Sequence, residues 1–299
     1  MGGTLSGLLE LTRIEDGHDA AGLPRVSYGA VIDPTFTIGP KVHGGSMQML
    51  VAHAATRAVA DLARPSAAGT RSADTSAAGA PTGADLIPVA IASDYLAAPD
   101  PAEVTLHVTV AKRGRTVSLL RVELVQNGRT MVSSSVTLAR PDTGAGRYSG
   151  TTVFDGVPAT PPADGITLES SAMAQINHLG PALDLVLDAD TFPMLRGETG
   201  EPLVRAWTRP KVGEPTTGFA VLVCDLSPPV VMNLGLFGWA PTVQLTTYVR
   251  REPAPGWLRF AASSTEVGPG MFEEDHVVVD STGTVVAQSR QLALIPQRS

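Results

Sequence analysis

A strand-like tetrapeptide and a proline-rich bend occur at 93–101, SDYLAAPDP, and again at 246–255, TTYVRREPAP. After each bend the chain continues in segments of alternating apolar and polar residues, which end at 133–139 and at 287–294. Self-similarity at a period of about half the chain indicates a duplicated unit. Two copies can diverge, so that one keeps a shape while the other keeps the chemistry.

Composition is that of an ordinary globular protein with an acidic balance. The chain has 299 residues, of which 43% are apolar and 17% charged, and its formal net charge is −7. This length allows two modest domains or one double domain, and the negative charge argues against a nucleic-acid partner. Cys224 is the single cysteine, so no disulfide can form within the chain.

The apolar segments do not resemble targeting or membrane segments. The opening residues, MGGTLSGLLELTRIEDG, have neither a cationic start nor an apolar stretch of signal-peptide length. The most apolar long stretch, 218–240, contains Asp225 and the pair Pro228-Pro229, which makes it a poor membrane span. We therefore expect a cytoplasmic protein without integral membrane association.

The first copy contains the clearest helix of the sequence. Apolar residues recur at helical spacing over 47–62, and Ser46 is its predicted N-cap. Before the helix, 28–38 is predicted as an edge strand, because Pro34 interrupts it. After the helix, 64–85 is a low-complexity segment of small residues, predicted as a mobile surface loop.

Alternation then predicts four strands in the first copy: 87–96, 103–112, 117–126 and 130–139. Asn127-Gly128 between the last two is a strong hairpin-turn signal. From Ser149 to about Gly165 the chain is rich in proline and glycine, and we assign 146–200 to a linker.

The second copy is less regular. A short strand is predicted at 203–209, and Thr216 or Thr217 is expected to cap an element that runs through Val223. Residue propensity favours a strand there, but the parallel with the first copy favours a helix, which we adopt, ended by Pro228-Pro229. Four further strands are predicted at 242–250, 257–267, 272–280 and 284–294, with Thr282-Gly283 as a turn.

Each copy is thus predicted to be one helix followed by an antiparallel meander. A helix laid across such a sheet covers its apolar face, and two units that pair edge to edge protect their exposed strands. The expected fold is α+β, with two tandem units in one extended sheet. We divide the chain into an N-terminal unit 1–145, a linker 146–200 and a C-terminal unit 201–299.

Asp225 is the first candidate for chemistry, because it lies within an otherwise apolar run, 221–226. A carboxylate in an apolar cleft can act as a general base, although a solvated Asp or a local cap has the same sequence signature. Thr242 opens one predicted strand and Gln291 lies on the last, and each alone is an ordinary strand residue. Cys224 is interpreted as a small buried hydrophobe.

Two glycines precede the first helix in the segment His43-Gly44-Gly45. Backbone N–H groups at such a helix start can hold an oxyanion, although a tight strand-to-helix turn also requires glycine. His53, inside that helix, is interpreted as a packed or rim histidine. The sequence has no cysteine or histidine pairs at metal-ligand spacing and no phosphate-binding glycine loop, so we expect neither a metal nor a cofactor.

Basic residues occur at predicted strand ends in both copies, namely Arg113, Arg250 and Arg251. They are either solvated surface residues or contacts for the phosphates of a nucleotide-tailed substrate such as coenzyme A.

As an ordered set, these motifs resemble the acyl-CoA thioesterase II family, and in particular its actinobacterial thioesterase-like branch. The resemblance covers about 25–295, apart from 64–85 and 145–200. It is carried by the Val42–Gly45 helix start, the serine-rich strand end at 133–139, Asp225 with PTVQL at 241–245, and VAQSRQ at 286–291.

The resemblance implies a double-hotdog fold, acyl-CoA as substrate and a homodimer or higher homo-oligomer. It also implies that Asp225, Thr242 and Gln291 together bind and activate the hydrolytic water, whereas the first copy, with His53 near the matching position, is catalytically silent. The chain departs from better-known members after Thr242, where they have an acidic residue and a histidine and this chain has Gln244 and Leu245.

From these features we expect hydrolysis of acyl-CoA to free fatty acid and CoA, with Asp225 as general base and N–H groups near Gly44, Gly45 or Gly218 as oxyanion donors. A hotdog enoyl-CoA hydratase or dehydratase is an alternative. It is disfavoured because the nearest histidines in sequence, His178 and His276, are far from Asp225. A non-catalytic acyl-CoA-binding protein is a further alternative.

Overall fold

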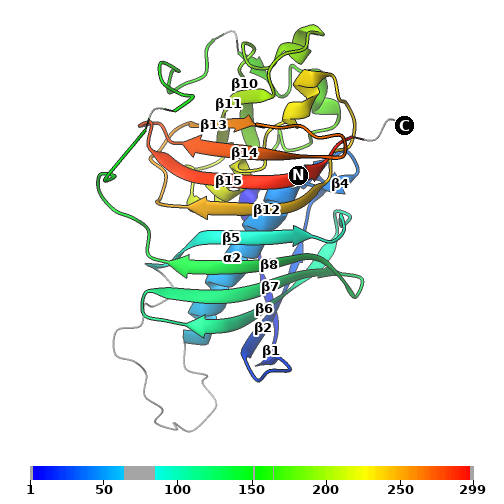
Figure 1. The fold of residues 1–299 in the computed structure, drawn as a ribbon. Helices are drawn as coiled ribbons and strands as arrows, with labels where there is room; N and C mark the ends of the chain where they lie inside the picture. Colours follow the sequence, from blue (N-terminus) through cyan, green and yellow to red (C-terminus); the bar gives the residue numbers. More distant parts are fainter. Residues whose placement is uncertain (1–2, 64–84, 151, 164, 297–299) are drawn as a thin grey trace.

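The computed structural model describes residues 3–63, 85–150, 152–163 and 165–296. Its centre is a single 13-stranded antiparallel sheet, with the long helix α2 (Gly44–Ala63) laid across one face (Figure 1). The sheet strands in chain order are β1 (Thr12–His18), β2 (Pro24–Val31), β5 (Ile87–Tyr95), β6 (Glu103–Arg113), β7 (Val117–Gln126), β8 (Arg129–Ala139), β9 (Ile166–Thr167), β10 (Leu183–Leu187), β11 (Leu203–Pro210), β12 (Thr242–Val249), β13 (Leu258–Ser263), β14 (Met271–Val279) and β15 (Val285–Leu294).

Shorter elements connect the strands of the sheet. They are the helices α1 (Leu5–Leu8) and α3 (Thr217–Val223), the strand pair β3 (Thr37–Ile38) and β4 (Lys41–Val42), and four 3₁₀ turns, η1 (Pro34–Phe36), η3 (Ala172–Gln175), η4 (Pro193–Arg196) and η5 (Val230–Leu234). Among the residues that the structure describes, no helix has both the length and the apolar character that a membrane crossing requires.

The predicted strands of both copies are confirmed to within a few residues, because buried and exposed side chains alternate along most of them. In β6 and β7, for example, every second side chain of the strand interior is buried. The predicted turn is confirmed as well: Asn127 and Gly128 both have positive φ, 52° and 73°, as a two-residue hairpin of the primed type requires.

The order of strands differs from a simple meander. β6, β7 and β8 follow one another, but β5 lies beside β8 rather than beside β6, and in the second copy β12 lies beside β15. This order leaves β5 and β12 free to pair with each other, antiparallel, with Ser93 opposite Leu245. The predicted edge-to-edge joining of two units is therefore confirmed, and Figure 1 shows the seam at mid-sheet.

Two predictions at the start of the chain are wrong. The strand β2 ends at Val31, before Pro34, which instead begins the 3₁₀ turn η1. β2 is also not an edge strand, because β1 pairs with its free side. The sequence concealed β1, since all of its residues are exposed and show no apolar alternation.

Helix α2 begins at Gly44, three residues before the predicted start, and Ser46 is not its N-cap. His43 occupies that position: its carbonyl accepts from the Met47 N–H (3.2 Å) and its ring Nδ1 accepts from the Ser46 N–H (3.2 Å). An imidazole nitrogen thus does what a Ser or Asp oxygen does at other helix starts.

The second copy has a much shorter helix. α3 spans seven residues, and Thr216 caps it as predicted, accepting from the Phe219 N–H (3.2 Å). The segment 146–200, predicted as a linker, contains β9 and β10, and β10 pairs with β11 at one end of the sheet. The segment 64–85, predicted as a loop, lies outside the described residues except for Asp85.

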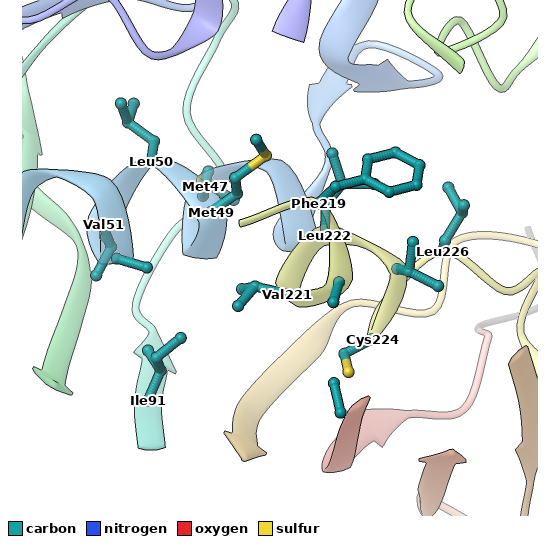
Figure 2. Packing of buried hydrophobic residues seen from close by; sticks show 14 of the residues in the cluster. Met47, Met49, Leu50, Val51, Ile91, Phe219, Val221, Leu222, Cys224 and Leu226 are labelled. Atoms are coloured by element: carbon teal, nitrogen blue, oxygen red, sulfur yellow. The ribbon is translucent and has the colours of Figure 1, made fainter. Parts of the chain in front are cut away.

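The main core lies between the sheet and the two helices. Leu50, Val51 and Ala54 of α2 have no exposed surface, and Phe219 and Leu222 of α3 lie against the start of the same helix (Figure 2). Burial of each such Leu or Phe side chain stabilises the fold by about 1.5–3 kcal/mol. This packing fixes the start of α2 and the end of α3 relative to each other.

Candidate active site

A cavity of about 1210 Å³ opens where α2 begins and α3 ends. The first copy contributes the β4–α2 junction and the end of β5, and the second contributes the turn after α3 with the adjoining ends of β12 and β15. Residues between 166 and 195 complete the wall. Most of the wall is apolar. Its polar side chains include those of His43, Tyr95, Asp225, Thr242 and Gln291.

The backbone around Asp225 is held by two side chains from other elements. α3 ends at Val223, and the carbonyl groups at a helix end need partners outside the helix. The Ser289 hydroxyl donates to the carbonyl of Cys224 (2.7 Å), and His43 Nε2 donates to the carbonyl of Asp225 (2.7 Å). Asp225 is thereby fixed at the cavity wall.

The Asp225 carboxylate is nearly removed from solvent, with 9% of its side chain exposed. Burial raises its pKa above the ordinary aspartate value. The neighbouring His43 ring, whose Nε2 lies 3.7 Å from Oδ2, and a hydrogen bond from the Gly45 N–H oppose that rise. The arrangement provides a carboxylate that can take up a proton at a higher pH than a solvated Asp.

Both ring nitrogens of His43 are engaged. A backbone N–H can only donate, so Nδ1, which faces the Ser46 N–H, is an acceptor, and the ring donates through Nε2 to the Asp225 carbonyl. Sequence reasoning found no histidine close to Asp225. The structure corrects this, because His43 reaches it from the other copy, 182 positions away.

Gly44 separates Asp225 from Tyr95. A Cβ atom on Gly44 would lie 2.5 Å from Asp225 Oδ2 and 3.5 Å from the Tyr95 ring, so no larger residue fits without displacing the carboxylate. The Tyr95 hydroxyl donates to the Gly44 carbonyl (3.0 Å). Glycine at this position is thus required for close approach, whichever role its N–H has.

Thr242 and Gln291 form a direct pair in the wall of the cavity that Asp225 also lines. The Thr242 hydroxyl donates to Gln291 Oε1 (3.0 Å), which leaves the Gln291 amide N–H groups as donors. Gln291 faces inward by ordinary alternation on β15. Thr242 reaches the same side because a bulge between Thr242 and Gln244 interrupts the register of β12 with β15.

Of the three predicted oxyanion donors, Gly44 lines the cavity, whereas Gly45 and Gly218 do not. The Gly45 N–H lowers the pKa of Asp225. Gly218 lies within α3 beside the side chain of Met49 and is not part of the cavity wall.

The three predicted phosphate contacts are not brought to the cavity. Arg250 follows β12 at the end opposite Thr242, roughly 26 Å away at about 3.3 Å per residue. Its guanidinium lies 5.6 Å from the Tyr248 ring centroid, and Arg251 donates to the Gly144 carbonyl. Arg113 ends β6, and the successive antiparallel pairings put that end on the same far side.

The remaining sequence candidates, Cys224 and His53, do not line the cavity. Cys224 is fully buried, which raises the pKa of its thiol, as expected for an inert small hydrophobe. His53 does not line the cavity, and burial lowers its pKa. Within the described ranges no three His, Cys, Asp or Glu side chains are grouped closely enough to hold a metal ion.

Family comparisons agree with this fold. A model of the acyl-CoA thioesterase N-terminal domain matches residues 32–139, and a model of the acyl-CoA thioesterase C-terminal domain matches 155–295. The chain therefore belongs to the acyl-CoA thioesterase family, with the double-hotdog fold. The second match begins inside the segment 146–200, which the sequence predicts as a linker.

Individual relatives add the following. An uncharacterized protein of Mycobacterium tuberculosis strain H37Rv is 38% identical over 277 residues, which are 87% of this chain and 88% of the relative. A thioesterase II candidate from Thermobifida fusca is 23% identical with a TM-score of 0.75, covering 99% of this chain and 98% of its own. A hot dog protein of unknown function from Alicyclobacillus acidocaldarius is 16% identical with a TM-score of 0.73, both chains being covered completely. At these identities the two structures show the fold alone.

Proposed function

We propose that this protein hydrolyses acyl-CoA thioesters, with Asp225 as the general base on a water molecule held by Thr242 and Gln291. One observation carries the proposal: a buried carboxylate shares an apolar cavity with a Thr–Gln pair whose free amide N–H groups can hold a water oxygen. In this arrangement Gln291 donates to the water, and the water donates to Asp225. The remaining lone pair of the water oxygen is then available for attack.

The reaction then follows from these positions. The water oxygen attacks the thioester carbonyl carbon while Asp225 takes up the proton. The tetrahedral intermediate collapses by breaking the C–S bond, and the proton on Asp225 passes to the departing thiolate. The products are a free carboxylic acid and CoA, and the base is regenerated without a cofactor. General-base action of this kind contributes about 10²–10⁴-fold to the rate.

We assign stabilisation of the oxyanion to the Gly44 N–H. It lies in the first turn of the 20-residue helix α2, where amides have no partner within the helix and the helix dipole is positive. Gly44 lines the cavity beside Asp225. One such donor contributes about 10²–10³-fold in other acyl-transfer enzymes.

The cavity suits an acyl chain. Flexible apolar side chains line it, among them Met47, Met173, Met194, Leu195 and Met232. Methionine adapts its shape to irregular ligands, so these walls accept chains of more than one form. We also carry over from the family a homodimer or higher homo-oligomer and a cytoplasmic location, which light scattering and cell fractionation test.

A hydratase or dehydratase is the second candidate, and one observation favours it: an Asp–His pair lies at the cavity, with 3.7 Å between His43 Nε2 and Asp225 Oδ2. Acid–base addition of water to an enoyl thioester needs two such groups. Both nitrogens of His43, however, are bonded to protein atoms, which supports hydrolysis. A non-catalytic acyl-CoA-binding protein is the third candidate.

The test is a panel of acyl-CoAs, from acetyl to palmitoyl, incubated with the purified protein while released CoA thiol is followed with a thiol-reactive dye. Hydrolysis predicts thiol release for at least one chain length and its loss in Asp225→Asn. Consumption of enoyl-CoA without thiol release identifies the hydratase. Binding without turnover of any substrate identifies a binding protein.

A further inference from the structure

A buried polar cluster lies behind the turn that carries Asp225. Glu274 and His276, on β14, are 0% and 1% exposed. The hydroxyl of Ser227, two residues after Asp225, lies between them: it donates to Glu274 Oε1 (2.5 Å) and is 3.0 Å from His276 Nε2. The proposed mechanism uses none of these three groups.

Glu274 holds the turn at a second point. Its other oxygen, Oε2, accepts from the Val230 N–H (3.0 Å). Between Ser227 and Val230 stand Pro228 and Pro229, which have no N–H to donate. Glu274 therefore accepts from both ends of the segment 227–230, whose two central residues offer no backbone donor.

A purely structural cluster is a poor explanation for these residues. Removal of a carboxyl and an imidazole from water is unfavourable, and apolar side chains of similar volume often give equal or greater stability. Moreover, His276 Nδ1 is buried without a hydrogen-bond partner among the described residues, which is a further cost to stability. Polar groups retained at such cost cluster at functional sites.

We propose that Glu274 is a positioning residue, which through Ser227 and the Val230 amide fixes the turn that presents the Asp225 carboxylate to the cavity. This inference rests on the proposed hydrolysis by Asp225. Glu274 is not part of the cavity wall. It acts on turnover through the residues that hold the water, namely Asp225 by way of the turn and Gln291, which stands opposite Glu274 in the β14–β15 register.

The charges of the two carboxyls are also coupled. Burial, and to a smaller extent the charge of Asp225, raises the pKa of Glu274 to about 7. The hydrogen bonds from Ser227 and Val230 lower this pKa and so oppose the rise. Burial lowers the pKa of His276 to about 3. His43 and Tyr95 face Asp225 from the other copy, and Asp275 adjoins His276, so Glu274 is one member of a cluster of titratable side chains that spans the seam.

The test is a double-mutant cycle in the full-length protein, with kcat and KM for the best acyl-CoA of the panel. Glu274→Leu removes both acceptors. We expect kcat to fall about 10-fold or more and KM to change by less than about twofold, because a small misplacement of a catalytic group greatly lowers the rate. Glu274→Gln keeps one acceptor, so it should recover most of kcat. In the Asp225→Asn background, Glu274→Leu should change the residual turnover by less than about twofold.

Glu273→Leu is the matched control. Glu273 precedes Glu274 on β14 and also accepts from backbone amides, those of Thr265 and Glu266, but on the outer side of the sheet. It should leave kcat unchanged. If Glu274→Leu does not fold, Ser227→Ala replaces it in the cycle, since it removes one of the two anchors.

The outcomes are distinct. Losses that vanish in the Asp225→Asn background support the inference. Equal losses in both backgrounds overturn it while the proposed hydrolysis stands, because Glu274 would then act only on general stability. A wild-type protein without turnover on any acyl-CoA overturns the proposed hydrolysis, and this inference with it.

Discussion

The imidazole of His43 donates a hydrogen bond to the backbone carbonyl of Asp225 (2.7 Å), across the boundary between the two copies. The same ring caps helix α2 through Nδ1. One side chain thus ties the start of α2 to the turn that follows α3. The site geometry depends on both helices through this contact.

Replacement of His43 tests this role against that of a catalytic base. His43→Ala should lower the free energy of unfolding by about 1–3 kcal/mol, because a buried carbonyl loses its donor. It should also lower kcat by about 10-fold, since Asp225 loses its support. Enoyl-CoA hydration that is present in the wild type and abolished by this change would contradict the proposed hydrolysis.

Gly44→Ala separates stability from activity. Alanine favours a helix by about 0.5–1 kcal/mol over glycine, but its Cβ would lie 2.5 Å from Asp225 Oδ2. We expect turnover to fall at least about 10-fold without loss of folded protein, as judged by circular dichroism. Gly270→Ala is the control, because a Cβ there meets nothing within 4 Å. Equal activity of the two variants would show that Asp225 tolerates the displacement.

The pH dependence of kcat/KM should reflect the buried base. Because burial raises the pKa of Asp225, the acid limb of the profile should lie above the ordinary aspartate range, near 4. Activity is lost as the pH falls through this pKa, since a protonated carboxyl accepts no proton from water. An acid limb at the pKa of a solvated aspartate would remove Asp225 from the role of base.

Stability should show the opposite trend with pH. The pKa of Glu274 is about 7 in the fold and 4.5 in the unfolded chain, so the fold binds this proton more tightly. The contribution is fully present below about pH 4.5 and is lost as the pH rises towards 7. Tm should therefore fall over this window, and less so in Glu274→Gln. Parallel Tm curves for the two proteins would contradict this.

The seam between the copies is predicted to depend on Gln48. Its amide donates to the Ser93 hydroxyl (3.1 Å) and the Leu245 carbonyl (3.2 Å), and its oxygen accepts from Thr247 (2.6 Å). Gln48→Leu removes the acceptor of the buried Thr247 hydroxyl and a donor to the Leu245 carbonyl, while Ser93 keeps its bond to Ser134 (2.9 Å). It should lower the free energy of unfolding by roughly 2–4 kcal/mol in urea titrations.

Gln244→Leu provides the matched comparison for Gln48. Gln244 also bonds across the seam, to Asp94 (3.0 Å), but in an exposed position, so its loss should change stability by less than about 0.5 kcal/mol. Similar losses for the two variants would mean that burial does not set the strength of the seam.

Most of the sheet could be predicted from the sequence, because apolar and polar residues alternate in strands with one buried face. Strand β1 was not predicted, because its side chains are all exposed and show no apolar alternation. Strand β10 was not predicted, because it lies in a segment without a clear alternation of apolar and polar residues. The apolar surroundings of Asp225 indicate it as a candidate, whereas its grouping with Thr242 and Gln291 is implied by the family resemblance alone. All three residues line one cavity.

The partners of Asp225 could not be found in the same way. His43 and Glu274 are distant from it in sequence, and their contacts depend on how helix ends and inner strand faces meet in three dimensions. A signal did exist for Glu274: it is a charged residue at a position of β14 where alternation requires an apolar side chain. The far position of Arg113 and Arg250 followed only from the strand order.

The β5–β12 seam has a consequence for the history and the engineering of this chain. Two identical single-copy subunits joined along such a strand pair would form a symmetric dimer with two equivalent sites. In the fused chain, Gly44 and His43 come from one copy, and Asp225, Thr242 and Gln291 from the other. Neither copy expressed alone therefore contains a complete site, and activity should return only when the two fragments are recombined.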